Sequence, residues 1–215
     1  MNTKDMLKQQ LFPTIMVPQF EELDPCRMNM SRLLIAANGL FIEAVKPWGR
    51  IVAPLWVNNR ERGLPYGKVI PYYDDFLHIL SAVSPVMSTA IVPAAAEYAE
   101  RDLEWGGWIV HEDGELRYQP VDFEATSGSA RITYPELQGT SLAVDIHSHG
   151  RIVPFFSSTD NKDDSGGVRI SIVLGNYSNQ EGRASFDYRV RFCVEGYFFD
   201  VTKEANTWSV ENSQK

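Results

Sequence analysis

Apolar and polar positions along the first part of the chain predict a small sheet. Residues 32–37 and 40–45 are apolar runs that flank Asn38-Gly39, a dipeptide typical of tight hairpin turns. A third apolar run covers residues 50–57 after a short Gly-containing turn. The pattern therefore predicts a hairpin and a third strand before the polar segment that follows.

A helical pattern comes next, and it is predicted over residues 71–84. Pro71 opens it, and two aspartates occupy its first turn, where they complement the helix dipole. Turn chemistry at Ser84-Pro85 predicts a division of the chain there. We expect an α+β N-terminal region of unknown role, a second domain and a C-terminal tail, at residues 1–85, 86–205 and 206–215.

The second part reads as an α/β domain. A short strand is predicted at 88–92, and an Ala-rich helix over 93–103. Segments with strand character follow, on both sides of a Gly-, Ser- and Asp-rich loop at 150–167: residues 105–111, 115–123, 130–134, 141–147, 168–175 and 185–200. The expected fold is a mixed sheet with flanking helices, preceded by the small α+β region.

Charge and composition exclude several classes of function. The net charge is −8 and the calculated pI is near 5.0, so the chain repels phosphate backbones and we expect no nucleic-acid partner. No signal-peptide pattern and no run of about 18 uninterrupted apolar residues is present, so we expect a cytoplasmic protein without a membrane partner. Cys26 and Cys193 cannot form a Cys-rich zinc cluster; two buried free thiols are favoured over a disulfide.

Two of the four histidines form the sequence His147-Ser148-His149 at the end of a predicted strand. Side chains at positions i and i+2 of a strand project from one face, so both imidazoles can reach one metal ion. An isolated His-x-His pair is more often a polar strand end than a metal site. The other two histidines, His78 and His111, are expected to be structural or exposed.

A Ser-x-x-Asp sequence, Ser157 to Asp160, follows the second histidine after seven residues. By itself this spacing is typical of a helix capping box. Combined with the histidines it offers a third ligand, because catalytic Zn²⁺ takes three protein ligands and keeps a fourth position for water. Such chemistry also needs a carboxylate outside the ligand set to move protons, and Glu104, before an apolar strand, is the candidate.

These residues resemble the signature of the JAMM (JAB/MPN-plus) zinc metalloproteases. The match consists of Glu104 before the Trp-Gly-Gly-Trp strand, the two histidines, Ser157 and Asp160, and it covers roughly residues 88–200. The resemblance implies a JAB/MPN-like fold with cytidine-deaminase-like layering. It also implies one Zn²⁺ held by His147, His149 and Asp160, with Glu104 as general acid/base and Ser157 supporting the oxyanion.

The resemblance further implies a deubiquitinase-like hydrolase. Its metal-bound water would attack the amide bond after the C-terminal tail of a ubiquitin-like or carrier protein. Residues 155–160, together with the N-terminal extension, are similar to the PRTRC-system protein A branch. Activating-enzyme-like and conjugating-enzyme-like partners are therefore expected. Two features depart from the family pattern: Gly150 replaces the usual proline after the second histidine, and only seven residues, 161–167, precede the next strand.

Several alternatives stay open from the sequence. The domain could be a non-catalytic MPN-type binding module, although no ligand residue is missing. A different His-x-His metal enzyme lacks its further ligands here. Asp145 lies two residues before His147 and could orient a histidine or be a strand-end charge. Asp163 and Asp164 are expected to be solvated. Residues 125–139 could guide a substrate tail by strand addition or form an ordinary edge strand.

Overall fold

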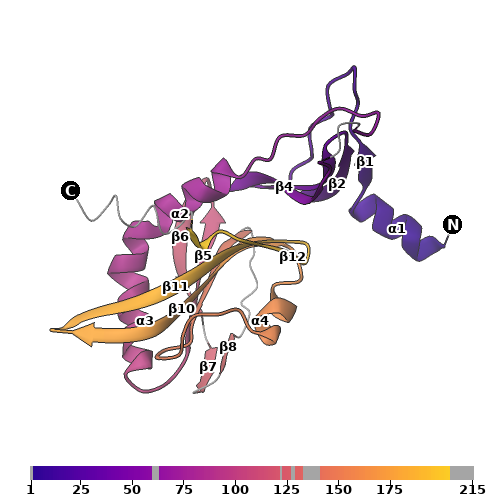
Figure 1. Ribbon diagram of the computed structural model, residues 1–215. Helices are drawn as coiled ribbons and strands as arrows, with labels where there is room; N and C mark the ends of the chain where they lie inside the picture. Colours follow the sequence, from indigo (N-terminus) through magenta and orange to yellow (C-terminus); the bar gives the residue numbers. More distant parts are fainter. Residues whose placement is uncertain (1, 60–62, 122, 127–128, 133–140, 204–215) are drawn as a thin grey trace. The chain divides into compact units, whose positions relative to one another are not determined.

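The structure is a computed structural model, and it describes residues 2–59, 63–121, 123–126, 129–132 and 141–203 (Figure 1). The predicted tail at 206–215 lies outside the described residues, as do residues 127–128 and 133–139 of the proposed tail-guiding segment. The chain forms two compact units, Met1–Phe76 and Leu77–Lys215.

The first unit is built on a sheet with the order β1-β2-β3-β4 among the described residues. Strand β1 pairs with β2 in parallel, and the other neighbours are antiparallel. The predicted hairpin is confirmed, because Ala36 pairs with Gly39 around the Asn38 turn. The sequence patterns did not reveal the first helix and strand. The elements are α1 (Thr3–Leu11), β1 (Thr14–Met16), β2 (Met30–Ala36), β3 (Gly39–Lys46) and β4 (Gly49–Val57).

The two helices predicted at 71–84 and 93–103 are confirmed with shifted ends, but they join into one continuous helix in place of the turn and strand predicted between them. It consists of α2 (Asp74–Val86), a π-helical turn η1 (Met87–Ile91) and α3 (Val92–Ala99). The predicted strand at 88–92 and the turn at Ser84-Pro85 are therefore wrong. The π-turn explains how Pro93 fits: the Val92 amide donates to the Met87 carbonyl, five residues back, so the helix widens just before the proline ring.

By length and composition alone, this 26-residue helix could cross a bilayer. Its apolar residues are concentrated on one side, where Ile79, Leu80, Val83, Ile91 and Ala95 are buried. Its opposite side exposes small or polar residues such as Ser81 and Ser88. This amphipathic distribution is typical of a helix that covers a protein core.

The second unit contains a mixed sheet with the order β12-β11-β10-β9-β5-β6 among the described residues. Strands β9 and β10 are parallel, and the other neighbours are antiparallel. The predicted strands are confirmed with shifted ends, except that residues 185–200 form two strands. They are β5 (Trp105–Glu112), β6 (Glu115–Pro120), β9 (Ser141–Ser148), β10 (Val168–Gln180), β11 (Arg183–Val194) and β12 (Tyr197–Asp200), beside the separate ribbon of β7 (Phe123–Thr126) and β8 (Ser129–Ile132).

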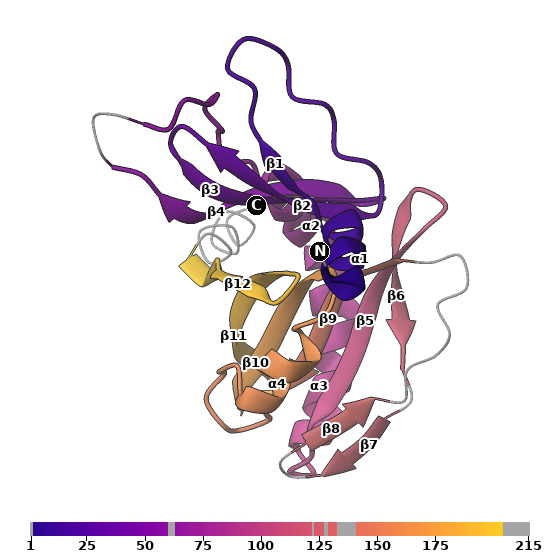
Figure 2. The same cartoon turned by 90° about the vertical axis from the view of Figure 1, so that its right-hand side faces the viewer.

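The two faces of this sheet have different roles. Helix α3 covers one face, where Ala96 and Ala99 pack with Tyr177 and Phe186. The opposite face has α4 (Ser158–Asp163) in front of it, as Figure 2 shows. Because side chains alternate along a strand, β9 sends Ile146 to the α3 face and His147 to the α4 face. The fold is thus the expected mixed α/β arrangement. The His147 side chain lies on the face of the sheet that α4 covers.

Both cysteines are free thiols, as predicted. Cys193 is fully buried, but Cys26 is only half-buried, so the prediction of two buried thiols is wrong for Cys26. Burial, and then the neighbouring Asp164, raises the pKa of Cys193 to about 12. That thiol therefore stays protonated at neutral pH and lacks the thiolate needed for nucleophilic chemistry.

Candidate metal centre

The two imidazoles lie at the end of β9, between its neighbours β5 and β10. His147 pairs with Gly106 on β5 and with Val173 on β10, and His149 follows the last residue of the strand. Their ring centroids are 5.1 Å apart. Gly106 brings no side chain beside His147. The strand register therefore presents both rings at one end of the sheet, where the central strand β9 ends.

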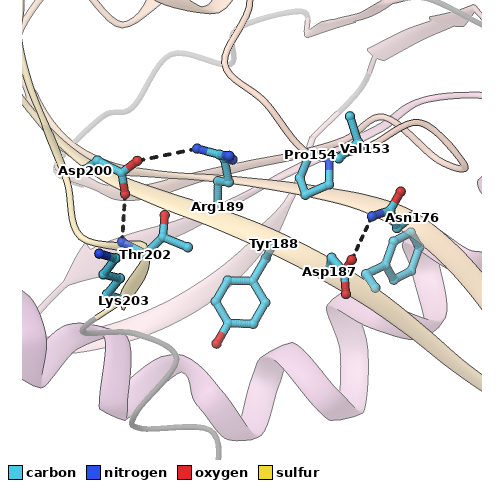
Figure 3. Close-up of a pocket in the computed structure, with 10 residues that line it drawn as sticks. Val153, Pro154, Asn176, Asp187, Tyr188, Arg189, Asp200, Thr202 and Lys203 are labelled. Carbon is cyan, nitrogen blue, oxygen red and sulfur yellow. Dashed lines mark hydrogen bonds and ion pairs between the residues drawn. The ribbon is translucent and has the colours of Figure 1, made fainter.

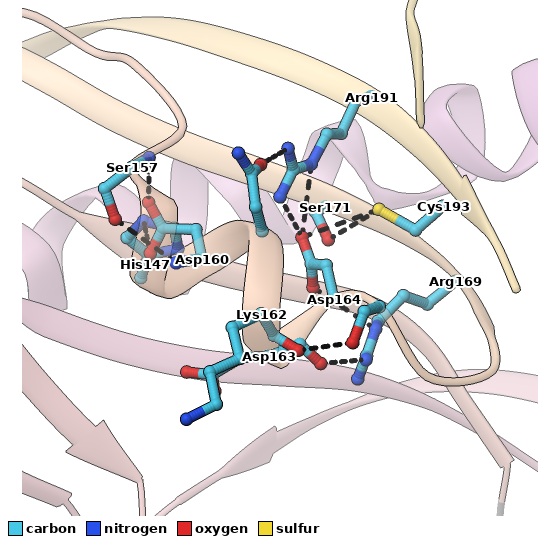
Figure 4. Close-up of polar contacts among 12 residues, drawn as sticks. His147, Ser157, Asp160, Lys162, Asp163, Asp164, Arg169, Ser171, Arg191 and Cys193 are labelled. Carbon is cyan, nitrogen blue, oxygen red and sulfur yellow. Dashed lines mark hydrogen bonds and ion pairs between the residues drawn. The ribbon is translucent and has the colours of Figure 1, made fainter. Parts of the chain in front are cut away.

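Helix α4 supplies the carboxylate of Asp160. Ser157 is the N-cap: its Oγ accepts a hydrogen bond from the Asp160 amide at 3.2 Å, and its own amide donates to Asp160 Oδ2 at 2.5 Å. This is a complete capping box, which fixes the carboxylate against the helix start. The other oxygen, Oδ1, lies 3.5 Å from His147 Nε2 (Figure 4). The capping box and the predicted ligand role thus involve the same side chain.

Three ligand-type atoms therefore converge. One atom each from His147, His149 and Asp160 lies within 4.8 Å of the other two. His147 Nε2 and His149 Nδ1 are buried, and neither has a hydrogen-bond partner among the described residues. Buried polar atoms are nearly always paired, because an unpaired one costs free energy. Two orphaned imidazole nitrogens beside a carboxylate are explained if a metal ion binds there, and a donor set of two nitrogens and one oxygen suits Zn²⁺.

The protonation states also suit metal binding. Burial lowers the pKa of His147 to about 4, against the opposing effect of Asp160, and burial lowers the pKa of His149 as well. Burial alone would raise the pKa of Asp160, but His147 and the Ser157 hydrogen bonds hold that pKa below its usual value. At neutral pH the rings are uncharged and the carboxylate is ionised. Metal ions bind these forms of the side chains.

Glu104 lies at the same end of the sheet, on the segment that leads into the neighbouring strand β5. It is buried and directly precedes β5, whose first residue, Trp105, pairs with Ser148. The Trp105 amide also donates to Ser148 Oγ at 3.2 Å. Extending this antiparallel register by one residue puts Glu104 next to His149. The structure thus brings all five predicted residues to one end of the sheet, Glu104 through register and the others through direct geometry.

The turn after the second histidine suits glycine rather than the proline of the signature that the sequence resembles. Gly150 has a φ of 57°, in the left-handed region that proline cannot adopt. Its carbonyl accepts a hydrogen bond from the Tyr177 amide at 2.9 Å, and the Ile152 carbonyl accepts one from the Asn176 amide at 2.8 Å. The loop is therefore bound to β10, and it presents Phe155 edge-on to His149, with centroids 4.8 Å apart.

We expect Gly175→Ala to disturb this loop. An added Cβ would lie 2.4 Å from the Ile152 carbonyl oxygen and 2.5 Å from the Pro154 nitrogen, and backbone atoms cannot move aside like a flexible side chain. Overpacking of this kind typically costs about 1–3 kcal/mol of stability. Urea denaturation should show the loss, and zinc affinity should fall with it. Gly166→Ala is the matched control, because nothing lies within 4 Å of its added Cβ. Equal stability of both variants would contradict the close approach.

Two acidic residues near the site behave differently from the predictions. Asp164 was expected to be solvated, but it is 5% exposed and its Oδ2 lies 2.7 Å from Arg191 Nη2. Sequence patterns could not reveal this partner, because Arg191 lies 27 residues further along the chain, on β11. Asp145 accepts a hydrogen bond from Trp108 Nε1 at 3.2 Å. Burial, and then the charge of Asp164, raises the pKa of Asp145 to about 7. Asp163 is exposed, as predicted.

A pocket of about 680 Å³ opens beside the loop that follows His149 (Figure 3). Val153 and Pro154 form one side, and residues of β11 and β12, including Arg189 and Asp200, form the other. The Arg189–Asp200 ion pair is 3.6 Å long and both side chains are more than half exposed. None of the five predicted site residues lines this pocket. The convergence of ligand atoms, rather than the volume of a cavity, therefore identifies the chemical centre.

Comparison with protein families agrees with the geometry. Residues 87–189 match the model described as prokaryotic homologs of the JAB domain. Over these residues the second unit is similar to the prokaryotic JAB domains. Residues 2–74 match a different model, a domain of unknown function named DUF2016. No curated protein matches the chain at a significant level.

The JAB match includes every predicted site residue. Glu104, the two histidines, Ser157 and Asp160 all fall within residues 87–189. The JAB family includes the JAMM metalloproteases, and the convergent histidines and aspartate form a candidate metal centre of the kind that such enzymes need. The match ends before Arg191, so the Arg191–Asp164 pair lies partly outside the region that the family model describes.

Proposed function

We propose that the JAB domain is a zinc-dependent peptidase or isopeptidase. Its substrate would be the amide bond after the C-terminal tail of a ubiquitin-like or carrier protein. The observation that carries this proposal is the convergence of one atom each from His147, His149 and Asp160 within 4.8 Å, with two buried imidazole nitrogens left without a partner among the described residues. The complete ligand set argues against a non-catalytic binding module.

The three ligand side chains would hold the ion at the end of the central strand β9. Bound there, Zn²⁺ would supply a Lewis acid and a water ligand whose pKa is lowered towards neutrality. Glu104, which is buried and directly precedes β5, would accept a proton and pass it to the leaving amine. Ser157 hydrogen-bonds to Asp160 through both its hydroxyl and its amide, and its hydroxyl hydrogen would support a developing oxyanion by donating to it.

The proposed partners come from the sequence resemblance. Residues 155–160 and the N-terminal extension are similar to the PRTRC-system protein A branch, so we also propose activating-enzyme-like and conjugating-enzyme-like partners. The DUF2016 match places a separate region before the JAB domain, and it assigns no role to that region. Neighbouring genes that encode a ubiquitin-like protein ending in Gly-Gly or an adenylating enzyme would support this assignment.

Metal content and cleavage together test the function. The purified protein should hold about one zinc per chain, measured by plasma emission spectrometry after dialysis against a weak chelator. It should then release a reporter fused behind ubiquitin-like proteins that end in Gly-Gly, including any encoded beside it. Stoichiometric zinc without cleavage of any such fusion would favour the binding module. Absence of zinc binding would refute the metallopeptidase outright.

A further inference from the structure

Helix α4 brings Asp160 to the site without an apolar anchor of its own. All six residues, Ser158–Asp163, belong to the described part of the chain, and none of their side chains is buried. A helix this short is unstable in isolation, because nucleation is unfavourable and few hydrogen bonds follow it. The capping box fixes Asp160 relative to the helix, but it does not fix the helix relative to the sheet. Another contact must hold the helix over the histidines.

Arg169 on β10 binds the end of the helix, at Asp164 Oδ1 and the Asp163 carbonyl, but the wider contact comes from Arg191 on β11. Its Nη2 and Nε donate to Asp164 Oδ2, at 2.7 Å and 3.2 Å, and its Nη1 donates to Asn161 Oδ1 at 2.5 Å (Figure 4). Asp164 is the C-cap of α4, and Asn161 lies within the helix. One guanidinium group thereby binds both the middle and the end of the helix that carries Asp160.

The same guanidinium also fixes the segment before the helix. Its carbon lies 3.8 Å from the ring centroid of Phe156 and 4.1 Å from that of Phe198. Phe156 directly precedes the N-cap Ser157, whereas Phe198 belongs to β12. Arg191 is itself 4% exposed, so these contacts occur away from water, where ionic hydrogen bonds and cation–π contacts are stronger.

We propose that Arg191 is a positioning residue that holds Asp160 in place for metal binding. It would act by fixing α4 at its start, middle and end against the sheet that carries His147. The inference rests on the proposed metal site, but it concerns a residue beyond the JAB match. The planar fork of arginine is essential to this role, because lysine keeps the charge but lacks both the rigid fork that spans Asp164 and Asn161 and the flat face that stacks between two rings.

Zinc affinity of Arg191→Lys tests the proposal. Competition with a chromophoric chelator should show a roughly 10- to 100-fold weaker affinity, the range typical for residues that support metal ligands. Arg189→Lys is the matched control: Arg189 lies two residues away on β11, its side chain is about half exposed, and it forms an ion pair with Asp200 across 3.6 Å. Its zinc affinity should equal that of the wild type.

A spectroscopic readout separates positioning from general destabilisation. In the Co²⁺-substituted protein, loss of the Asp160 ligand should change the visible absorption of Arg191→Lys but not that of Arg189→Lys. Asn161→Ala gives a milder second variant if Arg191→Lys fails to fold, because Asn161 is exposed and contributes one of the bonds. Its affinity should fall less, in the same direction.

The outcomes distinguish the inference from the function on which it rests. Wild-type protein that binds no zinc would overturn both. Wild-type binding with unchanged zinc affinity and unchanged Co²⁺ spectra in folded Arg191→Lys, or in Asn161→Ala if the first does not fold, would overturn the positioning role alone. The positioning role alone would also be overturned if the variants were less thermally stable than the wild type in the presence of chelator but bound zinc with the same affinity.

Discussion

Glu104→Gln should abolish hydrolysis while leaving the metal site loaded. The substitution keeps the size and polarity of a buried side chain beside His149 but removes its ability to accept a proton. General acid–base catalysis typically contributes about 10²- to 10⁴-fold, so kcat for cleavage of a Gly-Gly reporter fusion should fall by that factor. Zinc content should stay at about one per chain, because the carboxylate lies outside the proposed ligand set.

Glu100→Gln provides the matched control for this experiment. Glu100 caps α3 four residues earlier, and it accepts hydrogen bonds from Tyr177 and Asn179, which the glutamine carbonyl can also accept. Its kcat should therefore match that of the wild type. Full activity in Glu104→Gln, or an equal loss in both variants, would remove Glu104 from the mechanism. Loss of zinc along with activity would show that the residue is a ligand or a structural support.

Asp160→Asn should empty the site while preserving the fold. Asparagine can still accept the Ser157 amide hydrogen bond, so the capping box and α4 should persist. The neutral amide is a far poorer ligand than the carboxylate that now faces His147 Nε2 at 3.5 Å. Zinc affinity should fall by more than about 100-fold, beyond the loss expected for a supporting residue. Isothermal titration of the metal-free proteins measures this difference.

Asp163→Asn is the corresponding control on the same helix. Asp163 is exposed and is not one of the three converging groups, so its zinc affinity should be unchanged. Far-ultraviolet circular dichroism in chelator should be the same for both variants and the wild type. If Asp160→Asn binds zinc as tightly as Asp163→Asn does, the third ligand is a different residue and the proposed centre needs to be rebuilt.

The site was easier to predict than its surroundings because its pattern is local. His147 and His149 project together from any strand that ends there, and Ser157 and Asp160 cap any helix that begins there. Predicting the position of Glu104 also required knowing that β5 pairs with β9. That pairing joins residues that are 30 to 43 positions apart, and the sequence offered only that adjacent strands could bring Glu104 and His147 together.

The sequence predictions were wrong where tertiary structure overrides the local preference of a residue. Pro85 and Pro93 are ordinarily breakers, but the π-turn at Met87–Ile91 accommodates the second of them within one long helix. Asp164 looked solvated because its partner, Arg191, lies 27 residues away on a strand that is not adjacent in sequence. Such a buried ion pair depends on the completed sheet, so no local pattern reveals it.

The central claim is that one metal ion is held by two imidazoles and the carboxylate at the start of α4. Crystals grown with one equivalent of zinc, measured on both sides of the zinc absorption edge, test it directly. We expect one anomalous peak per chain, at about 2.0–2.2 Å from a nitrogen of His147, a nitrogen of His149 and an oxygen of Asp160. A peak elsewhere, or an Asp160 side chain turned away from the histidines, would contradict the account.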